Sequence, residues 1–143
     1  MSLDWLALLF MVLSLGVFFS SYSAPHEIGW DSSIPAMERF KRYREAAGWA
    51  LVSSKYTSPG PSTCAPFLLY VEAEFLINRR SQMNCYLLSS VCIRIMLKMG
   101  LHRDPSKLAN LSPFEGEMRR RIWNLAIQID LMVSFHMGLP SSK

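Results

Sequence analysis

The tripeptide His102-Arg103-Asp104 has the order found in the catalytic loop of protein kinases. In that loop the aspartate is the base, and an asparagine five residues later holds magnesium. Here the fifth position is Ala109, and Asn110 comes one residue too late. The sequence also has no glycine-rich nucleotide loop and no Asp-Phe-Gly. We therefore interpret the tripeptide as a chance match and read Asp104-Pro105 as a turn.

Other catalytic patterns are missing from the sequence as well. It contains no Gly-x-Ser-x-Gly elbow, no phosphate-binding glycine loop and no His-Glu-x-x-His pair. The three histidines, His26, His102 and His136, are scattered between a loop, a helix exit and a helix end. No nucleophile can be matched with a base, so we expect a protein that is not an enzyme.

The three cysteines, Cys64, Cys85 and Cys92, form no Cys-x-x-Cys pair. Neither a disulfide framework nor a zinc site is supported, and we expect no metal and no cofactor in this chain. Cys85 and Cys92 lie seven residues apart, on one face of a helix. We expect both to be buried as small hydrophobic residues in a protein of a reducing compartment.

Residues 112–123, SPFEGEMRRRIW, have the pattern of a helix N-terminus. Ser112 is a good N-cap, Pro113 fits the first helical position, and Glu115 stands three residues after the cap. Together they predict a capping box. Gly138 and Pro140 predict the end of the same helix.

The arginine run Arg119-Arg120-Arg121 could contact nucleic acid, bind an anion or form a solvated helix face. Consecutive helical residues point about 100° apart, so the three side chains cannot act together on one face. Glu115 and Glu117 lie four residues before Arg119 and Arg121, the favourable order for ion pairs. Because the net charge is only +4 and acids separate the basic groups, we favour ion pairing over DNA contact.

Asp130 is the one acid in an otherwise apolar part of this helix, on a stripe that includes Arg120, Trp123 and Ser134. A carboxylate buried there without a partner would be costly. We expect it to form a structural ion pair with an arginine.

The rest of the chain is also predicted to be helical. Apolar residues recur at helical spacing in residues 36–54, 67–77 and 83–99, and Gly100 followed by Leu101 is typical of a C-terminal cap. Residues 23–35 are rich in turn formers, and residues 55–66 hold three prolines and a glycine, which predicts a loop. No segment alternates over the length of a strand. The fold class is therefore all-α, an orthogonal bundle of about five helices.

The N-terminal run Trp5 to Phe19 is apolar on all sides. It does not fit a signal peptide, because the only charge ahead of it is that of Asp4. It is close to the length that spans a bilayer, and a helix in a multi-helix core would have the same composition. The residues alone do not distinguish a core helix from a membrane span.

Several linked features run through the second half: an apolar helix leading into GLHRDPS, a spacer, SPFEGEMRRRIW, then Asp130, Ser134 and a closing Gly-Leu-Pro. In this combination the chain from Val91 onward closely resembles the fungal-specific transcription factor domain. This domain is the middle homology region of binuclear zinc cluster regulators and includes the xylanolytic-activator-like regulatory domains. LLFMVLSLGVFF and FLLYVEAEFLI resemble its first and third helices, so the resemblance covers nearly the whole chain.

The resemblance implies an all-helical regulatory domain over residues 1–143 in a nuclear protein that controls transcription by RNA polymerase II. It favours the core-helix interpretation of the N-terminal run, and effector or transcription-machinery proteins as partners. In the family, DNA binding belongs to a separate N-terminal six-cysteine cluster with two zinc ions. This chain has no such cluster, and the family domain continues past residue 143. We therefore expect a domain that is incomplete at its C-terminus, with an undetermined oligomeric state.

Two positions depart from the family pattern. Asn124 stands where the family often has a second aromatic residue, and Leu139 where it often has arginine. The alternative hypothesis, from another class, is a small membrane-anchored helical protein that uses residues 5–19 as its span. The residues to which we assign a structural role in the motif are Gly100, Leu101, His102, Arg103, Asp104, Ser112, Pro113, Glu117, Arg119, Arg120, Arg121, Trp123, Asp130, Ser134, Gly138 and Pro140.

Overall fold

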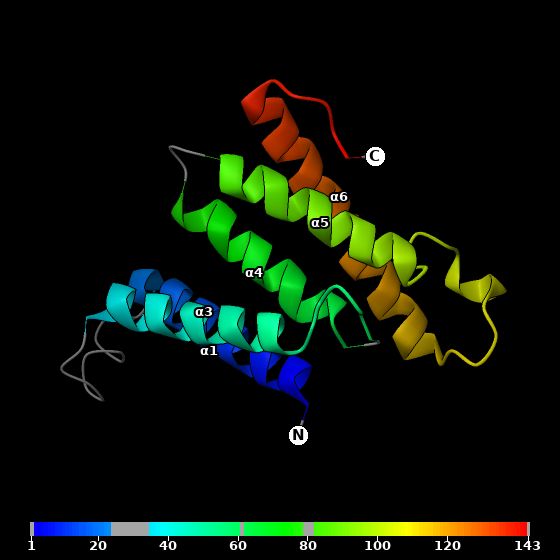
Figure 1. Ribbon diagram of the computed structural model, residues 1–143, viewed down its shortest axis with the longest axis horizontal. Coiled ribbons are helices and arrows are strands. Elements are labelled where there is room, and N and C mark those ends of the chain that lie inside the picture. Colours follow the sequence, from blue (N-terminus) through cyan, green and yellow to red (C-terminus); the bar gives the residue numbers. More distant parts are fainter. Residues whose placement is uncertain (1, 24–34, 61, 79–81, 143) are drawn as a thin grey trace.

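The computed structural model of the chain describes residues 2–23, 35–60, 62–78 and 82–142. These residues form five α-helices and one short 3-10 turn, and none of them lies in a strand, which confirms the expected all-α bundle (Figure 1). The elements are α1 (Leu3–Ser23), α3 (Ala36–Ser53), α4 (Cys64–Ile77), α5 (Met83–Lys98), η1 (Pro105–Lys107) and α6 (Pro113–Met137).

The predicted boundaries agree closely with these elements except at α4. The loop prediction for residues 55–66 is wrong at its end, because α4 begins at Cys64 and includes Pro66. A proline is tolerated there, since the first turn of a helix has no use for its missing N–H. Most of the turn-rich passage 23–35, including His26, lies outside the described residues.

Helix α4 is the centre of the bundle, because it contacts α1, α3, α5 and α6. Its sequence, CAPFLLYVEAEFLI, is apolar on nearly every side, as expected for a helix surrounded by others. One buried cluster, including Met11, Phe18 and Phe40, fills the space between α4 and the pair α1 and α3. A larger cluster joins α4 to α5 and α6. Figure 1 shows α1 behind α3 on one side of α4, with α5 and α6 on the other.

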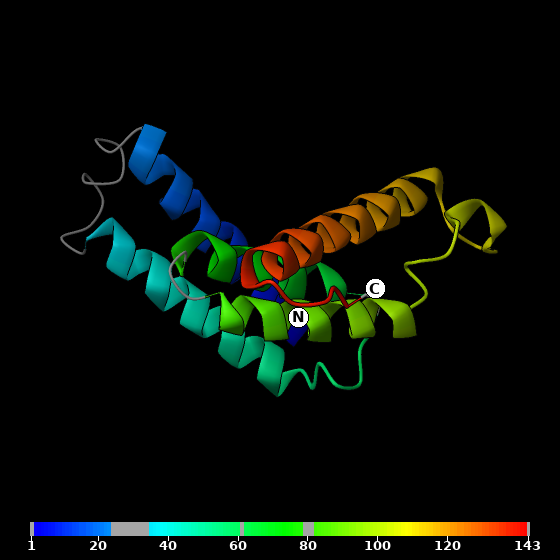
Figure 2. The ribbon, with the colours of Figure 1, turned by 90° about the horizontal axis from the view of Figure 1, so that it is seen from above.

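Helix α1 buries one face only. Ala7, Met11, Ser14, Leu15 and Phe18 are buried at helical spacing, and the Ser14 hydroxyl donates a 3.0 Å hydrogen bond to the carbonyl oxygen of Phe40 in α3. That bond satisfies the one polar side chain on the buried face. In Figure 2, α1 and α3 run together at one end of the bundle.

The opposite face of α1 is exposed although it is equally apolar. Residues Leu3–Ser21 have a mean hydropathy of 2.0 and enough length to cross a membrane, and 22% of the most apolar stretch is buried. The core-helix interpretation therefore accounts for one face of α1 and leaves the other without a partner in the described part of the chain.

A buried ion pair, which the sequence did not predict, links α3 to α4. The guanidinium Nη2 of Arg44 lies 2.6 Å from the Glu74 carboxylate, and their side chains are 15% and 5% exposed. The guanidinium also lies over the Tyr70 ring, 4.0 Å from its centroid, and the side-chain amide of Asn78 donates to the second Glu74 oxygen. Both charged groups are therefore largely shielded from water, and each has a partner besides the other. These additional contacts help to offset the free-energy cost of removing the two charges from water.

Replacing Arg44 by Met should lower the free energy of unfolding by about 3–5 kcal/mol, because Glu74 would stay buried without its counter-charge. The double variant Arg44→Met/Glu74→Met should recover a large part of that loss. Arg42→Met is the matched control: Arg42 pairs with Glu38 at the surface with a side chain that is 60% exposed, so its loss should be below about 1 kcal/mol. Urea denaturation measures all three, and an equal loss for Arg42→Met and Arg44→Met would contradict the assignment.

Candidate functional site

The family-like motif begins where α5 ends. Gly100 has a φ of +76°, a conformation that glycine adopts without strain. The N–H of Gly100 donates to Leu97 O at 3.1 Å, and the N–H of Leu101 donates to Met96 O at 3.0 Å. These two bonds define a Schellman cap, with Leu101 buried against the core. The predicted cap at Gly100 is confirmed.

Arg119 of α6 completes this cap from a distant part of the chain. Its Nη2 donates a 2.8 Å hydrogen bond to the carbonyl oxygen of Met99, the last residue of the α5 turn. A cation at a helix C-terminus also interacts favourably with the helix dipole. The predicted Glu115–Arg119 ion pair is wrong, because Arg119 reaches α5 and Glu115 closes the capping box instead. Arg119 therefore ties α6 to the end of α5.

The start of α6 forms as predicted. Ser112 Oγ accepts from the Glu115 N–H at 3.1 Å, and the Glu115 carboxylate accepts from the Ser112 N–H at 3.0 Å, which is a complete capping box with Pro113 at the first position. Gly116 is buried against the 3-10 turn, and a Cβ on it would lie 3.1 Å from the Pro105 side chain. The small residue in SPFEGEMRRRIW thus allows this close approach.

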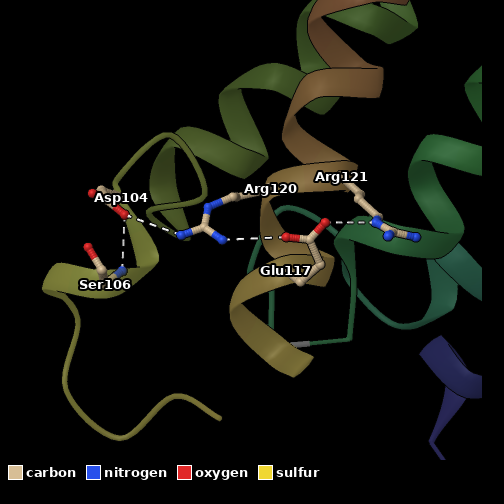
Figure 3. Close-up of polar contacts among 5 residues, drawn as sticks. All are labelled: Asp104, Ser106, Glu117, Arg120 and Arg121. Atoms are coloured by element: carbon tan, nitrogen blue, oxygen red, sulfur yellow. Dashed lines mark hydrogen bonds and ion pairs between the residues drawn. The ribbon is translucent and has the colours of Figure 1, made fainter. Parts of the chain in front are cut away.

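Arg120 and Arg121 form a surface network with two acids (Figure 3). Arg120 lies 3.7 Å from Asp104 and 3.4 Å from Glu117, and the Nε of Arg121 donates to Glu117 at 2.9 Å. The predicted Glu117–Arg121 pair is confirmed. However, the Arg121 side chain is 73% exposed and this ion pair lies within α6, so the pair does not join α6 to another helix.

The two acids of this network have lowered pKa values. The pKa of Glu117 is below its usual value chiefly because Arg121, and then Arg120, donate hydrogen bonds to its ionised form. The pKa of Asp104 is lowered first by the hydrogen bond that its carboxylate, the N-cap of the 3-10 turn, accepts from the backbone N–H of Ser106. Both acids stay charged at neutral pH, so they neutralise Arg120 and Arg121 locally.

The kinase-like tripeptide has no catalytic geometry. His102, Arg103 and Asp104 are all exposed, and the His102 ring packs near Trp123 with 6.1 Å between centroids. Asp104 faces Ser106 and Arg120. These residues form the connection between α5 and α6, in agreement with the turn prediction.

Asp130 is buried, with a residue exposure of 1%, but none of its partners among the described residues is an arginine. Ser142 donates to the carboxylate through both its backbone N–H and its hydroxyl, each at 2.8 Å, and the Ser89 hydroxyl of α5 donates at 3.2 Å. The predicted ion pair is therefore wrong. Three hydrogen-bond donors satisfy the oxygens of this carboxylate without a counter-ion.

The tail after α6 is held against α5 by the same cluster. Gly138, with a φ of +67°, forms a second Schellman cap with Leu139, and the chain turns back from there. The Tyr86 hydroxyl donates to Pro140 O at 2.8 Å, and the hydroxyls of Ser90 and Ser142 lie 2.8 Å apart. Figure 2 shows the tail running between α5 and α6. Tyr86, Ser89, Ser90 and Ser142 carry no pattern by which the sequence could have singled them out.

The described residues offer little for metal or ligand chemistry. They contain no group of three metal-ligating side chains. An open apolar depression of about 460 Å³ lies between the ends of α4 and α6 and the start of α5, lined by Phe75, Gln82, Met132, Phe135 and His136. Phe135 at its rim is 90% exposed, so the depression does not enclose a small molecule as ligand sites usually do.

The chain matches the family model of the fungal specific transcription factor domain over residues 6–143. It is 37% identical over 137 residues to the Zn(2)-C6 fungal-type transcription factor pigI of Monascus ruber, and 34% identical over 139 residues to the factor mpsB of Macrophomina phaseolina. The equisetin cluster transcription factor eqxF of Fusarium heterosporum is 32% identical over 142 residues.

Each of these alignments covers 95% of this chain, but only 16%, 18% and 20% of the respective relatives. No solved structure matches the chain significantly.

Asp130→Ala should lower the free energy of unfolding by about 2–4 kcal/mol, because it removes three hydrogen bonds to a charged acceptor and leaves the Ser142 N–H without its partner. Asp130→Asn keeps the volume and one acceptor oxygen, so its loss should be smaller. Arg120→Ala, at the exposed surface, should cost less than about 1 kcal/mol. Chemical denaturation of the three variants checks this order, and a reversal between Asp130→Ala and Arg120→Ala would refute the assignment.

Arg119→Ala and Arg121→Ala form a second matched pair, two residues apart on the same helix. The Arg119 variant should lose about 1.5–3 kcal/mol, because a hydrogen bond from a charged donor to the α5 carbonyl is broken. The Arg121 variant should stay within about 0.5 kcal/mol of wild type, since its ion pair is solvated. Equal losses of stability for the two variants in thermal unfolding would contradict the assignment that Arg119 joins α6 to α5.

Proposed function

The chain belongs to the fungal-specific transcription factor domain family, and on that basis we propose that it is the regulatory, non-enzymatic region of a nuclear transcription factor acting on genes read by RNA polymerase II. The match over residues 6–143 is the observation on which the proposal rests. Within that span, the residues that make the motif recognisable act as joints between helices: Gly100 and Arg119 at the end of α5, and Asp130 between α5 and the tail.

DNA and zinc binding are proposed for another part of the full-length factor. The relatives named Zn(2)-C6 share only 16% and 18% of their length with this chain. Here the three cysteines are buried in the core as free thiols. Burial raises the pKa of Cys64 to about 11 and that of Cys85 to about 12, which disfavours the thiolate that binds zinc.

The arginine run is also a poor DNA contact. Arg119 is engaged with the Met99 carbonyl, and Arg120 and Arg121 share the carboxylates of Asp104 and Glu117. Arginines bind DNA by neutralising phosphates and releasing the cations condensed on them, and side chains already paired with carboxylates are less suited to this. The proposed partners are therefore proteins or effectors of the transcription apparatus.

We extend the proposal to genes of a biosynthetic cluster. Several relatives are named as cluster transcription factors, among them those for equisetin in Fusarium heterosporum and fusarisetin A in a Fusarium species. The alignment with each of them covers 95% of this chain.

A domain exchange tests the proposed role. In the Monascus ruber factor, the segment that aligns with this chain is replaced by the chain itself, and the transcripts that depend on that factor are measured. We expect the exchanged factor to accumulate in the nucleus and to retain regulated transcription. Introducing Asp130→Ala should reduce those transcripts, whereas Arg121→Ala should not. An exchanged factor that accumulates in the nucleus but supports no transcription would contradict the proposal.

A further inference from the structure

A groove runs between α3 and α5, both of which pack on α4 (Figure 1). The groove is apolar and has a volume of about 180 Å³, and its walls include Gly48 and Val52 of α3, Tyr70 of α4, and Leu88 and Val91 of α5. A Cβ at position 48 would lie 3.2 Å from the Tyr70 ring, so the glycine lets this ring lie directly against α3. An apolar cavity of ~150 Å³ holds a molecule the size of benzene, so the groove can take one large apolar side chain.

The α5 side of the groove carries two cations. Leu87, Val91, Arg94 and Lys98 follow one another at three- and four-residue steps, so they share one face of α5, and all four are exposed. Neither Arg94 nor Lys98 forms an ion pair with a residue that the structure describes. This face of α5 is therefore apolar beside the groove and basic toward the end of the helix.

The α3 side adds a third cation at the same end of the groove. Both α3 and α5 end on the right of Figure 1, and the exposed Lys55 follows α3 there. Helix α5 contains no acidic residue, and Glu74 of α4 is already paired with Arg44. Glu45 of α3 is an exposed acid one turn before Gly48. The balance of charge around the groove is positive, which favours a partner that carries carboxylates.

The spacing of the cations favours an extended peptide over a small molecule. Lys98 lies seven residues beyond Val91, about 10 Å along α5. A molecule small enough to fill the groove cannot also reach Lys98. An extended peptide advances about 3.3 Å per residue, so a segment anchored in the groove brings a carboxylate to Lys98 within about three residues. Duplex DNA presents phosphates at its surface and would leave the apolar groove unfilled.

We propose that the groove between α3 and α5 binds an acidic peptide segment of a regulatory partner protein. A leucine- or phenylalanine-sized side chain fills the groove, and carboxylates on the same segment pair with Arg94 and Lys98. The proposal rests on the proposed regulatory function and names the chemistry of the partner. The buried anchor supplies most of the affinity, whereas the exposed cations select an acidic sequence and speed association.

Fluorescence anisotropy with a labelled peptide tests the proposal on the full chain. The probe is Asp-Asp-Phe-Asp-Asp-Leu, and two control peptides replace either its aspartates by asparagine or its phenylalanine by serine. We expect the probe to bind and each control peptide to bind about tenfold more weakly, because each lacks one of the two complementary features. Raising the salt concentration from about 0.05 to 0.5 M should weaken binding of the probe, since exposed charges are screened.

Matched variants of the chain locate the site. Lys98→Glu should raise the Kd of the probe about fivefold or more, because it reverses a charge beside the groove. Lys107→Glu makes the same change at an exposed position of η1, which contacts α6, and should leave the Kd within about twofold of wild type. Val91→Ser should also weaken binding, whereas Val12→Ser on α1 should not. Helical circular dichroism should be unchanged in all four variants.

Three results would overturn the proposal: no binding of the probe, equal binding of the asparagine peptide, or equal losses in Lys98→Glu and Lys107→Glu. A short DNA duplex that binds more tightly than the probe and is lost in Lys98→Glu would assign the cations to nucleic acid, and would also overturn it. Transcription from the exchanged factor is measured separately, so absent peptide binding with intact transcription counts against the groove alone.

Discussion

A carboxylate can be buried between helices only when hydrogen bonds replace the water that it loses, and the packing of α6 onto α5 depends on this constraint at Asp130. Its oxygens accept from Ser89 on α5 and from the N–H and hydroxyl of Ser142 on the tail. One side chain therefore specifies two contacts, that of α6 with α5 and that of the tail with both. An apolar residue could fill the same space, but it would not select the position of the tail.

The opposite end of the α5–α6 contact is held by a different kind of polar joint. Arg119 donates to the last turn of α5, beside the left-handed Gly100. Asp130 and Arg119 are eleven residues apart, about three turns of α6, so the two joints hold the helix at separated points. Between them, Ala126 and Ile129 pack into the core shared with α4 and α5, and Val133 joins the same core just after Asp130. Hydrophobic burial supplies most of the stabilisation, and the polar joints set the register at which α6 docks.

Local sequence signals predicted the helices well because caps and periodicity act over a few residues. The Ser112 capping box and the glycine caps at positions 100 and 138 are confirmed to the residue. Partners across the fold were harder to infer. Asp130 was correctly expected to be buried but was assigned an arginine, and Arg119 was assigned to its helical neighbour Glu115. Both errors have one cause: a sequence shows which charges are near in the chain, whereas tertiary packing brought Ser142 and Met99 to them.

The apolar helix α1 shows a further limit of sequence reasoning. It is hydrophobic on all sides, so periodicity could not tell which face would be buried or whether either would be. The structure buries the face with Met11 and Phe18 and leaves the Trp5 to Phe19 stripe exposed. The buried Arg44–Glu74 pair was missed for a related reason, since α3 has many charged residues and nothing in its sequence marks Arg44 as the one that faces α4.

Amide hydrogen exchange of Ser142 tests the central claim most directly. If Asp130 holds the tail against α5 and α6, the Ser142 N–H should exchange far more slowly than an unstructured amide although Ser142 lies outside any helix. Exchange at the rate of a free peptide would show that the tail is not held, and that the burial of Asp130 needs another explanation.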